Sequence, residues 1–123
     1  MISHIHSTAV AVADQDAALD FYVNTLGWDV GINVPMGEDR FLTVVPPGAT
    51  TQLALNPASW FSEEHSAPGK VGISLITPDV DATYETLKER GVKFKGPVEE
   101  EPWGDRATSF YDLDGNEFYL ING

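Results

Sequence analysis

Glu117 and Tyr119 are the residues of this sequence best placed to do acid–base chemistry. They are two positions apart in a run that alternates between apolar and polar residues, so a β-strand here would carry a carboxylate and a phenol on one face. Phe118 and Leu120 would then point to the core. Such a pair could act as a base or an acid, or hydrogen-bond a ligand. The sequence places no histidine or second acid beside Glu117, so an exposed carboxylate at a strand end is the simpler interpretation.

His4 and His6 have the same spacing, and their imidazoles would also share a strand face. Imidazole pairs of this kind can bind a metal ion. Glu63 and His65 could complete such a site. The simpler interpretation is that histidines near a chain end are solvated.

Arg40 and Arg106 are at equivalent positions of two similar segments of the chain. Guanidinium groups can hold an anionic ligand through paired hydrogen bonds. Pairing with the many surface acids is the alternative, and the composition favours it. The sequence contains no P-loop, dinucleotide-binding fingerprint, nucleophile elbow or zinc-protease helix.

The composition predicts one domain over residues 1–123, with 42% hydrophobic residues. The absence of cysteine excludes thiolate metal sites and disulfides, and is typical of a cytoplasmic protein. A net charge of −12 repels phosphate backbones, so we expect no nucleic-acid partner. We also expect no signal peptide and no membrane partner, because the apolar runs are too short.

The elements that must position these residues come from a duplication. Residues 71–94 predict a strand, an acidic helix cap, a helix ending at Gly91 and a second strand, and residues 7–30 repeat this order 65 positions earlier. Further strands are expected at 40–45, 52–55, 106–111 and 117–121. The sequence therefore predicts an α+β fold with two βαβββ modules, about 1–56 and 71–123.

Small residues line one face of the first strand in each module. Ser7, Ala9 and Ala11 alternate with larger residues in the first module, and Gly72 and Ser74 do so in the second. Small side chains on a strand leave room for a ligand or for a close backbone approach. We therefore expect these faces to line a cavity.

The segment joining the modules, about 57–70, shows no periodicity and is expected to be a working loop or a linker. Trp60 and Phe61 lie in it, and two adjacent aromatic residues in a loop either bind something or cover the edge of a core. Trp103 lies in a second predicted loop, and all three could stack on a planar ligand.

Three longer stretches carry a resemblance to a known family. They are V-A-D-Q-D-A-A-L-D-F-Y-V-N-T-L-G-W, P-D-V-D-A-T-Y-E-T-L-K-E-R-G-V and F-Y-D-L-D-G-N-E-F-Y-L. With the paired βαβββ order, they resemble the vicinal oxygen chelate superfamily of glyoxalases, bleomycin-resistance proteins and extradiol dioxygenases. The resemblance implies a curved mixed sheet around a cavity. It does not define an activity, because the superfamily contains enzymes and binding proteins.

Metal-dependent members of the superfamily use His and Glu ligands on the first and last strands of each module. The resemblance places Ser7, Gln52 or Ala54, Gly72 and Tyr119 at these positions. A serine, a glycine and a tyrosine do not supply the donors that a divalent metal needs. We therefore expect no cofactor and no metal.

The resemblance and these substitutions favour a metal-free binding protein of the bleomycin-resistance type, with a small-molecule ligand and a homodimeric assembly. Two alternatives stay open: a glyoxalase or dioxygenase-type enzyme with a displaced metal site, and a metal-free lyase or isomerase using Glu117 or Tyr119. The expected ligand is planar and neutral or cationic, because Glu117 is the one charge predicted on the strand faces of the cavity and the net charge is −12. Arg40 and Arg106 would reverse this charge preference if both faced inward. The predicted ligand-binding residues are Ser7, Gln52, Trp60, Phe61, Gly72, Ser74, Trp103, Arg106, Glu117 and Tyr119.

Overall fold

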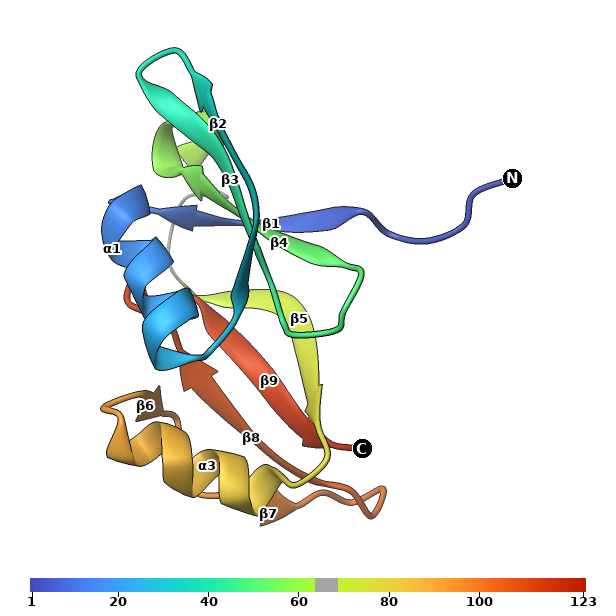
Figure 1. The fold of residues 1–123 in the computed structure, drawn as a ribbon. Helices are drawn as coiled ribbons and strands as arrows, with labels where there is room; N and C mark the ends of the chain where they lie inside the picture. The colour runs from blue at the N-terminus through green and yellow to red at the C-terminus, as the bar shows by residue number, and fades with distance from the viewer. Residues whose placement is uncertain (64–68) are drawn as a thin grey trace. The chain divides into compact units, whose positions relative to one another are not determined.

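The computed structural model describes residues 1–63 and 69–123, and it divides into two units, Met1–Ala67 and Pro68–Gly123 (Figure 1). Each unit contains one mixed sheet with a helix between its first two strands. The predicted α+β class and the βαβββ order of both modules are confirmed. No helix among residues 1–63 and 69–123 is long and apolar enough to cross a membrane.

The first unit has a four-stranded sheet in the order β1-β4-β3-β2. β1 and β4 are parallel and the other neighbours are antiparallel. Its elements are β1 (Ser7–Val12), α1 (Gln15–Asp20), a π-helical turn (Phe21–Thr25), β2 (Asp29–Met36), β3 (Asp39–Val45), β4 (Gln52–Pro57) and a 3₁₀ turn (Ala58–Trp60).

The second unit repeats this plan with the strand order β5-β9-β8-β6, and a short β7 pairs with β8. β5 and β9 are the parallel pair. Its elements are β5 (Lys70–Thr77), α3 (Val80–Glu89), β6 (Lys93–Phe94), β7 (Glu99–Glu100), β8 (Arg106–Tyr111) and β9 (Glu117–Asn122). β7 lies inside the stretch that the sequence predicted as a loop.

The helices begin where an aspartate caps the free backbone N–H groups of the first turn. Asp14 Oδ1 accepts hydrogen bonds from the N–H groups of Asp16 and Ala17, and Asp79 Oδ1 accepts one from Ala82. The predicted acidic caps are therefore Asp14 and Asp79. The helix predicted within residues 7–30 is α-helical only over Gln15–Asp20, and Phe21–Thr25 is a π-helical turn.

The buried side chains follow the predicted alternation on the strands. Phe118 and Leu120 of β9 are buried, as predicted, and the Phe118 ring stacks on that of Phe110. In the first unit, the buried set includes Val10, Val12, Phe21, Tyr22, Leu42, Val44 and Leu55. This packing fixes which face of each strand is left for other functions.

The turn between β8 and β9 is held by a buried carboxylate. Asp112 Oδ1 accepts hydrogen bonds from the N–H groups of Asp114 and Asn116, and its Oδ2 accepts one from the Asn116 side chain, all at 2.9 Å. Asp112 is 7% exposed. Because β9 begins at Glu117, this turn sets the register in which Glu117 and Tyr119 enter the sheet.

Replacing Asp112 by alanine is expected to lower the free energy of unfolding by roughly 2–4 kcal/mol, because three donors lose a charged acceptor. Urea titration followed by circular dichroism measures this change. Leu113→Ala in the same turn is the control, since Leu113 is 62% exposed and its loss is expected within about 0.5 kcal/mol. Equal losses in the two variants would show that the Asp112 hydrogen bonds do not hold the turn.

Candidate functional site

The second unit has a hollow of about 230 Å³ on the face of its sheet. Three neighbouring strands form it, since Ser74 of β5 and Ser109 of β8 both lie opposite Tyr119 of β9 in the hydrogen-bonding register. The residues that line it are Lys70, Gly72, Ile73, Ser74, Ser109, Glu117 and Tyr119. Four residues predicted for the ligand site, Gly72, Ser74, Glu117 and Tyr119, are therefore brought together.

The hollow exists because β5 is irregular there. Its pairing with β9 shifts register between Lys70 and Ser74, and Gly72 lies within this stretch with φ +71°. A side chain is strained at that φ, although a Cβ would meet no atom within 4 Å. Gly72 thus lets the strand bulge, and the short serine side chains leave the space beside it open.

The hollow carries more charge than the sequence predicted. Glu117 is largely buried, with 12% of its side chain exposed, and its Oε2 lies 3.6 Å from the Nζ of Lys95. Lys70 lines the same hollow. The expectation that Glu117 would be the one charge there is wrong, because β5 begins at Lys70, one residue before the predicted start, and Lys95 lies beside Glu117.

The Tyr119 hydroxyl is buried and has no hydrogen-bond partner among the described residues. Burial raises the pKa of Tyr119 above its ordinary value of 10.0, and the nearby carboxylates of Glu101 and Asp105 raise it further. Glu101 is close enough to affect this pKa, yet its carboxylate does not meet the hydroxyl in a hydrogen bond of ordinary geometry. Tyr119 is therefore a neutral phenol at physiological pH, and its hydroxyl lies beside the Glu101 carboxylate without a well-aligned hydrogen bond.

In the first unit, the corresponding strands β1 and β4 place Ser7 opposite Gln52. Gln52 Oε1 accepts a hydrogen bond from Thr43 Oγ1, which accepts one from the Ile32 N–H at 2.7 Å. A Cβ at Gly31 would lie 2.5 Å from this Thr43 oxygen, so glycine is required there. The Gln52 carbonyl is thus engaged within the sheet.

The arginines are engaged as well. Arg106 donates to both carboxylate oxygens of Asp81, at 2.9 and 2.7 Å, and Arg40 donates to Asp16 at 2.7 Å. Hydrogen bonds from Arg106 are the largest cause of the lowered pKa of Asp81. Arg106 is not among the residues that line the hollow.

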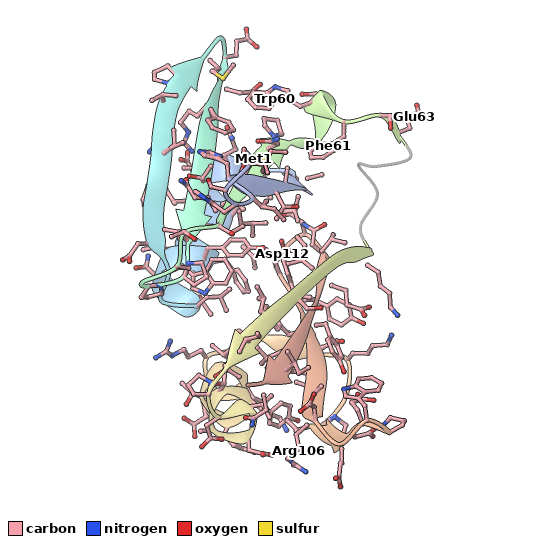
Figure 2. The ribbon with its side chains drawn as sticks, turned by 90° about the vertical axis from the view of Figure 1, so that its right-hand side faces the viewer. Met1, Trp60, Phe61, Glu63, Arg106 and Asp112 are labelled. Atoms are coloured by element: carbon pink, nitrogen blue, oxygen red, sulfur yellow. The ribbon has the colours of Figure 1, made fainter. Side chains whose placement is uncertain are left out.

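The aromatic residues predicted for ligand stacking lie in three different settings. Trp60 ends the 3₁₀ turn of the first unit and is 40% exposed; Phe61 follows it with part of its side chain exposed (Figure 2). Trp103 is 62% exposed in the turn closed by the hydrogen bond from Gly104 N–H to Glu101 O. None of the three lines the hollow of the second unit.

The residues present do not fit a family-type metal centre. Within residues 1–63 and 69–123, no three His, Asp, Glu or Cys side chains are grouped so that they could hold a metal ion. At the family's ligand positions, Gln52 already accepts a hydrogen bond and Tyr119 keeps its proton, and a neutral phenol is a poor ligand. His65 lies outside the described residues, while His4 and His6 are exposed and contact the neighbouring hydroxyls of Ser3 and Ser7.

The sequence analysis missed Lys70, Lys95 and Ser109. Ser109 could have been found, because continuing the alternation of β8 from Ala107 places it on the face opposite Phe110. Lys70 shares the face of Gly72 and Ser74 once the strand is begun at its true first residue. Lys95 follows a two-residue strand and gives no periodic signal.

Comparison with known proteins gives a consistent family. The sequence pattern of the Glyoxalase/Bleomycin resistance protein/Dioxygenase superfamily matches residues 4–120. A structure of a superfamily member from Sphaerobacter thermophilus is 51% identical, with a TM-score of 0.94 and coverage of 99% of this chain and 98% of that one. TnmS3, an antibiotic binding protein from Streptomyces sp. CB03234, is 41% identical, with a TM-score of 0.83 and coverage of 98% of this chain and 96% of that one. The ethylmalonyl-CoA/methylmalonyl-CoA epimerase of Cereibacter sphaeroides is 33% identical over 108 residues, 80% of this chain and 79% of that protein.

Tyr119→Phe is expected to raise the free energy of unfolding of the ligand-free protein by about 1 kcal/mol, because it removes a buried hydroxyl without a partner. The raised pKa of Tyr119 adds a pH signature. The unfolded tyrosine ionises first, so the stability of the original protein falls as pH rises above about 10, and this fall is smaller in the phenylalanine variant. Urea titrations at neutral and alkaline pH measure both effects.

Tyr111→Phe is the control for this experiment, since it removes a tyrosine hydroxyl from the neighbouring strand β8. A loss of stability in Tyr119→Phe, with no change in the alkaline response, would show that the hydroxyl is satisfied in solution.

Proposed function

Because the chain belongs to the Glyoxalase/Bleomycin resistance protein/Dioxygenase superfamily, we propose that it binds a small organic molecule in the hollow of its second unit without a metal ion. The buried Tyr119 hydroxyl, which forms no well-aligned hydrogen bond with any residue that the structure describes, is the observation that carries this proposal. A buried donor without an acceptor costs about 1–3 kcal/mol. A ligand that supplies the acceptor recovers this free energy on binding.

The size of the hollow limits the ligand. Pockets for drug-sized molecules usually measure about 300–1,000 Å³. At about 230 Å³, this one holds a small molecule or one ring system of a larger molecule. The short side chains of Ser74 and Ser109 and the absent side chain of Gly72 leave the backbone accessible, which suits a flat group lying on the sheet.

The relatives support binding as the function. TnmS3 is an antibiotic binding protein, and its 41% identity extends over almost the whole chain. The absence of a family-type metal set from the described residues is compatible with binding and removes the usual basis of metal-dependent catalysis in this fold. Ser7, Gln52, Trp60, Phe61, Trp103 and Arg106 do not line this hollow, and their part in ligand binding stays a prediction from the sequence.

Metal-free isomerisation is the second candidate, supported by the epimerase relative and by the largely buried Glu117 carboxylate. Glu117 and Tyr119 lie on one face of one strand, so both groups reach a ligand from the same side. Inversion of a carbon centre usually needs a base and an acid on opposite sides. The arrangement therefore suits a proton shift along one face better than an epimerisation.

A ligand found by a thermal-shift screen is expected to stabilise the protein by about 2.7 kcal/mol at a hundred times its Kd, and to do so in the presence of a chelator. Ser74→Phe is expected to abolish this stabilisation by filling the hollow. Ile76→Phe on the same strand is the matched control, because Ile76 is 74% exposed and does not line the hollow. Calorimetry gives the affinities.

Three results would change this conclusion. Loss of binding on chelation, with about one metal per chain by elemental analysis, would restore a metal-dependent function with a displaced site. Unchanged binding in Ser74→Phe would show that the ligand binds outside the hollow. If the original protein converts the ligand and Glu117→Gln does not, the protein is an isomerase. If the ligand is recovered unaltered, the protein is a binding protein.

We also propose a cytoplasmic homodimer, with Trp60 and Phe61 of the connecting region in the interface. Trp60 is an exposed aromatic residue, and two-fold dimers are the commonest soluble assemblies. Light scattering at micromolar concentration is expected to report a dimer, and Trp60→Ala with Phe61→Ala to weaken it. A monomer at every concentration contradicts the dimer; a dimer unchanged by the double substitution contradicts the assigned interface alone.

A further inference from the structure

Three hydroxyl groups form a row across the sheet of the second unit. Ser74 of β5 and Ser109 of β8 both lie opposite Tyr119 of β9, and all three residues line the hollow. Neighbouring strands are about 4.8 Å apart, so the row spans roughly 10 Å. This width suits a single six-membered ring with its substituents.

None of these hydroxyls has a well-aligned hydrogen bond to a residue within 1–63 or 69–123. The hydroxyl of Thr108, on the opposite face of β8, is by contrast engaged and donates to the Gly96 carbonyl at 2.8 Å. A hydroxyl can donate one hydrogen bond and accept others. The row therefore offers both donors and acceptors to a ligand.

A donor and an acceptor of opposite charge lie on the same face as this row. Lys70 is opposite Glu117 in the pairing of β5 with β9, and both residues line the hollow. In the part of the chain that the structure describes, they form no ion pair with each other, and the neighbour of Glu117 is Lys95 at 3.6 Å. A ligand atom between Lys70 and Glu117 would therefore meet an ammonium group on one side and a carboxylate on the other.

Carboxylates outnumber lysines around the hollow. Glu101 and Asp105 are close enough to Tyr119 to raise its pKa, and with Glu117 they make three carboxylates against two lysines. This balance disfavours an anionic ligand. A hydroxyl group of a neutral ligand can donate to a carboxylate, and such charge-assisted hydrogen bonds are strong.

We propose that this hollow binds a neutral polyhydroxylated ring, which is a monosaccharide or the glycosyl group of a larger molecule. The inference rests on the proposed function and specifies its ligand. Each ring hydroxyl donates and accepts, so one type of group serves the hydroxyl row, the Lys70 ammonium and the carboxylates. An acid in its ionised form has no donor for Glu117, and an ammonium ligand has no acceptor for Lys70 or Tyr119.

Lys70 and Glu117 orient the ring. One ring hydroxyl accepts from Lys70 and donates to Glu117 through a single oxygen, whereas the donor and the acceptor of an amide are different atoms. The ring then lies over Gly72, whose missing side chain leaves room, and its next hydroxyls meet the hydroxyl row. Ile73 is the apolar side chain of the lining and suits the C–H groups of the ring. A hollow of about 230 Å³ holds one such ring.

The methyl glycosides of glucose, galactose and mannose test the proposal. Methoxycyclohexane is the matched probe, because it has a six-membered ring and the methoxy group but no hydroxyls. Calorimetry or ligand-observed NMR gives the Kd values. The best of the three glycosides is expected to bind roughly 30-fold more tightly than methoxycyclohexane, which is the effect of two ordinary hydrogen bonds.

Two further sets of probes define the ligand more closely. The methyl glycosides of the corresponding amino sugar and uronic acid place a cation and an anion on the same ring, and both are expected to bind more weakly than the neutral glycoside. The 4-nitrophenyl glycoside of the best sugar distinguishes the two sources. Tighter binding than the methyl glycoside indicates the glycosyl group of a larger molecule, and equal binding indicates a free monosaccharide.

The variants test the residues that carry the proposal. Ser109→Ala is expected to weaken binding of the best glycoside about fivefold and Lys70→Met about tenfold, with no change for methoxycyclohexane. Thr86→Val and Lys93→Met are the matched controls, because they remove a hydroxyl and a charge from exposed residues of the same unit that do not line the hollow. Thermal melts confirm that each variant is folded.

The outcomes distinguish this inference from the proposed function. If no glycoside binds, but Ser74→Phe abolishes binding of another ligand, the hollow binds small molecules and the sugar proposal is wrong. If Ser74→Phe affects no ligand at all, binding at the hollow is itself wrong. Tighter binding of the amino sugar or the uronic acid than of the neutral glycoside would contradict a neutral ligand. Equal losses in Ser109→Ala and Thr86→Val would overturn the role of the hydroxyl row.

Discussion

The parallel pairing of the first and last strand of each unit is the constraint on which the site depends. Two parallel strands cannot be joined by a tight turn, so each unit needs a long connection that includes a helix. The result is that residues distant in sequence become direct neighbours. Ser7 lies opposite Gln52 in the first unit and Ser74 opposite Tyr119 in the second, with the same separation of 45 residues. The duplication has conserved this register while the residues at the paired positions have diverged.

A second contact is repeated with equal regularity. In each unit, the aspartate two residues after the helix cap forms an ion pair with an arginine at or near the start of the penultimate strand. The pairs are Asp16 with Arg40 and Asp81 with Arg106. The pairs are exposed, so they add little to the free energy of unfolding. Their effect is on function, because guanidinium groups held on the first turn of a helix are not available to a ligand. Lys70 is the cation among the residues that line the hollow of the second unit.

The sequence predicted the elements well because alternation on strands and aspartate caps on helices are local signals. It placed Phe118 and Leu120 in the core and Glu117 and Tyr119 on the opposite face, as the structure has them. It missed the π-helical turn Phe21–Thr25, since i→i+5 pairing leaves no separate pattern of apolar residues. The position of Glu101 near Tyr119 was also beyond prediction, because it depends on an irregular turn and not on a repeat.

Three unfavourable features of the second unit lie on one face of its sheet. Gly72 interrupts the pairing of β5, and Glu117 buries most of a carboxylate beside a lysine at 3.6 Å. The buried Tyr119 hydroxyl has no well-aligned hydrogen bond to any described residue. Each has a structural explanation by itself, since a bulge protects an edge strand and a loose ion pair tolerates a carboxylate. The hydroxyl has none, because phenylalanine would fill the same space without its cost. Features that weaken a fold and cluster around one cavity are typical of sites selected for binding, where the ligand restores what the empty protein lacks.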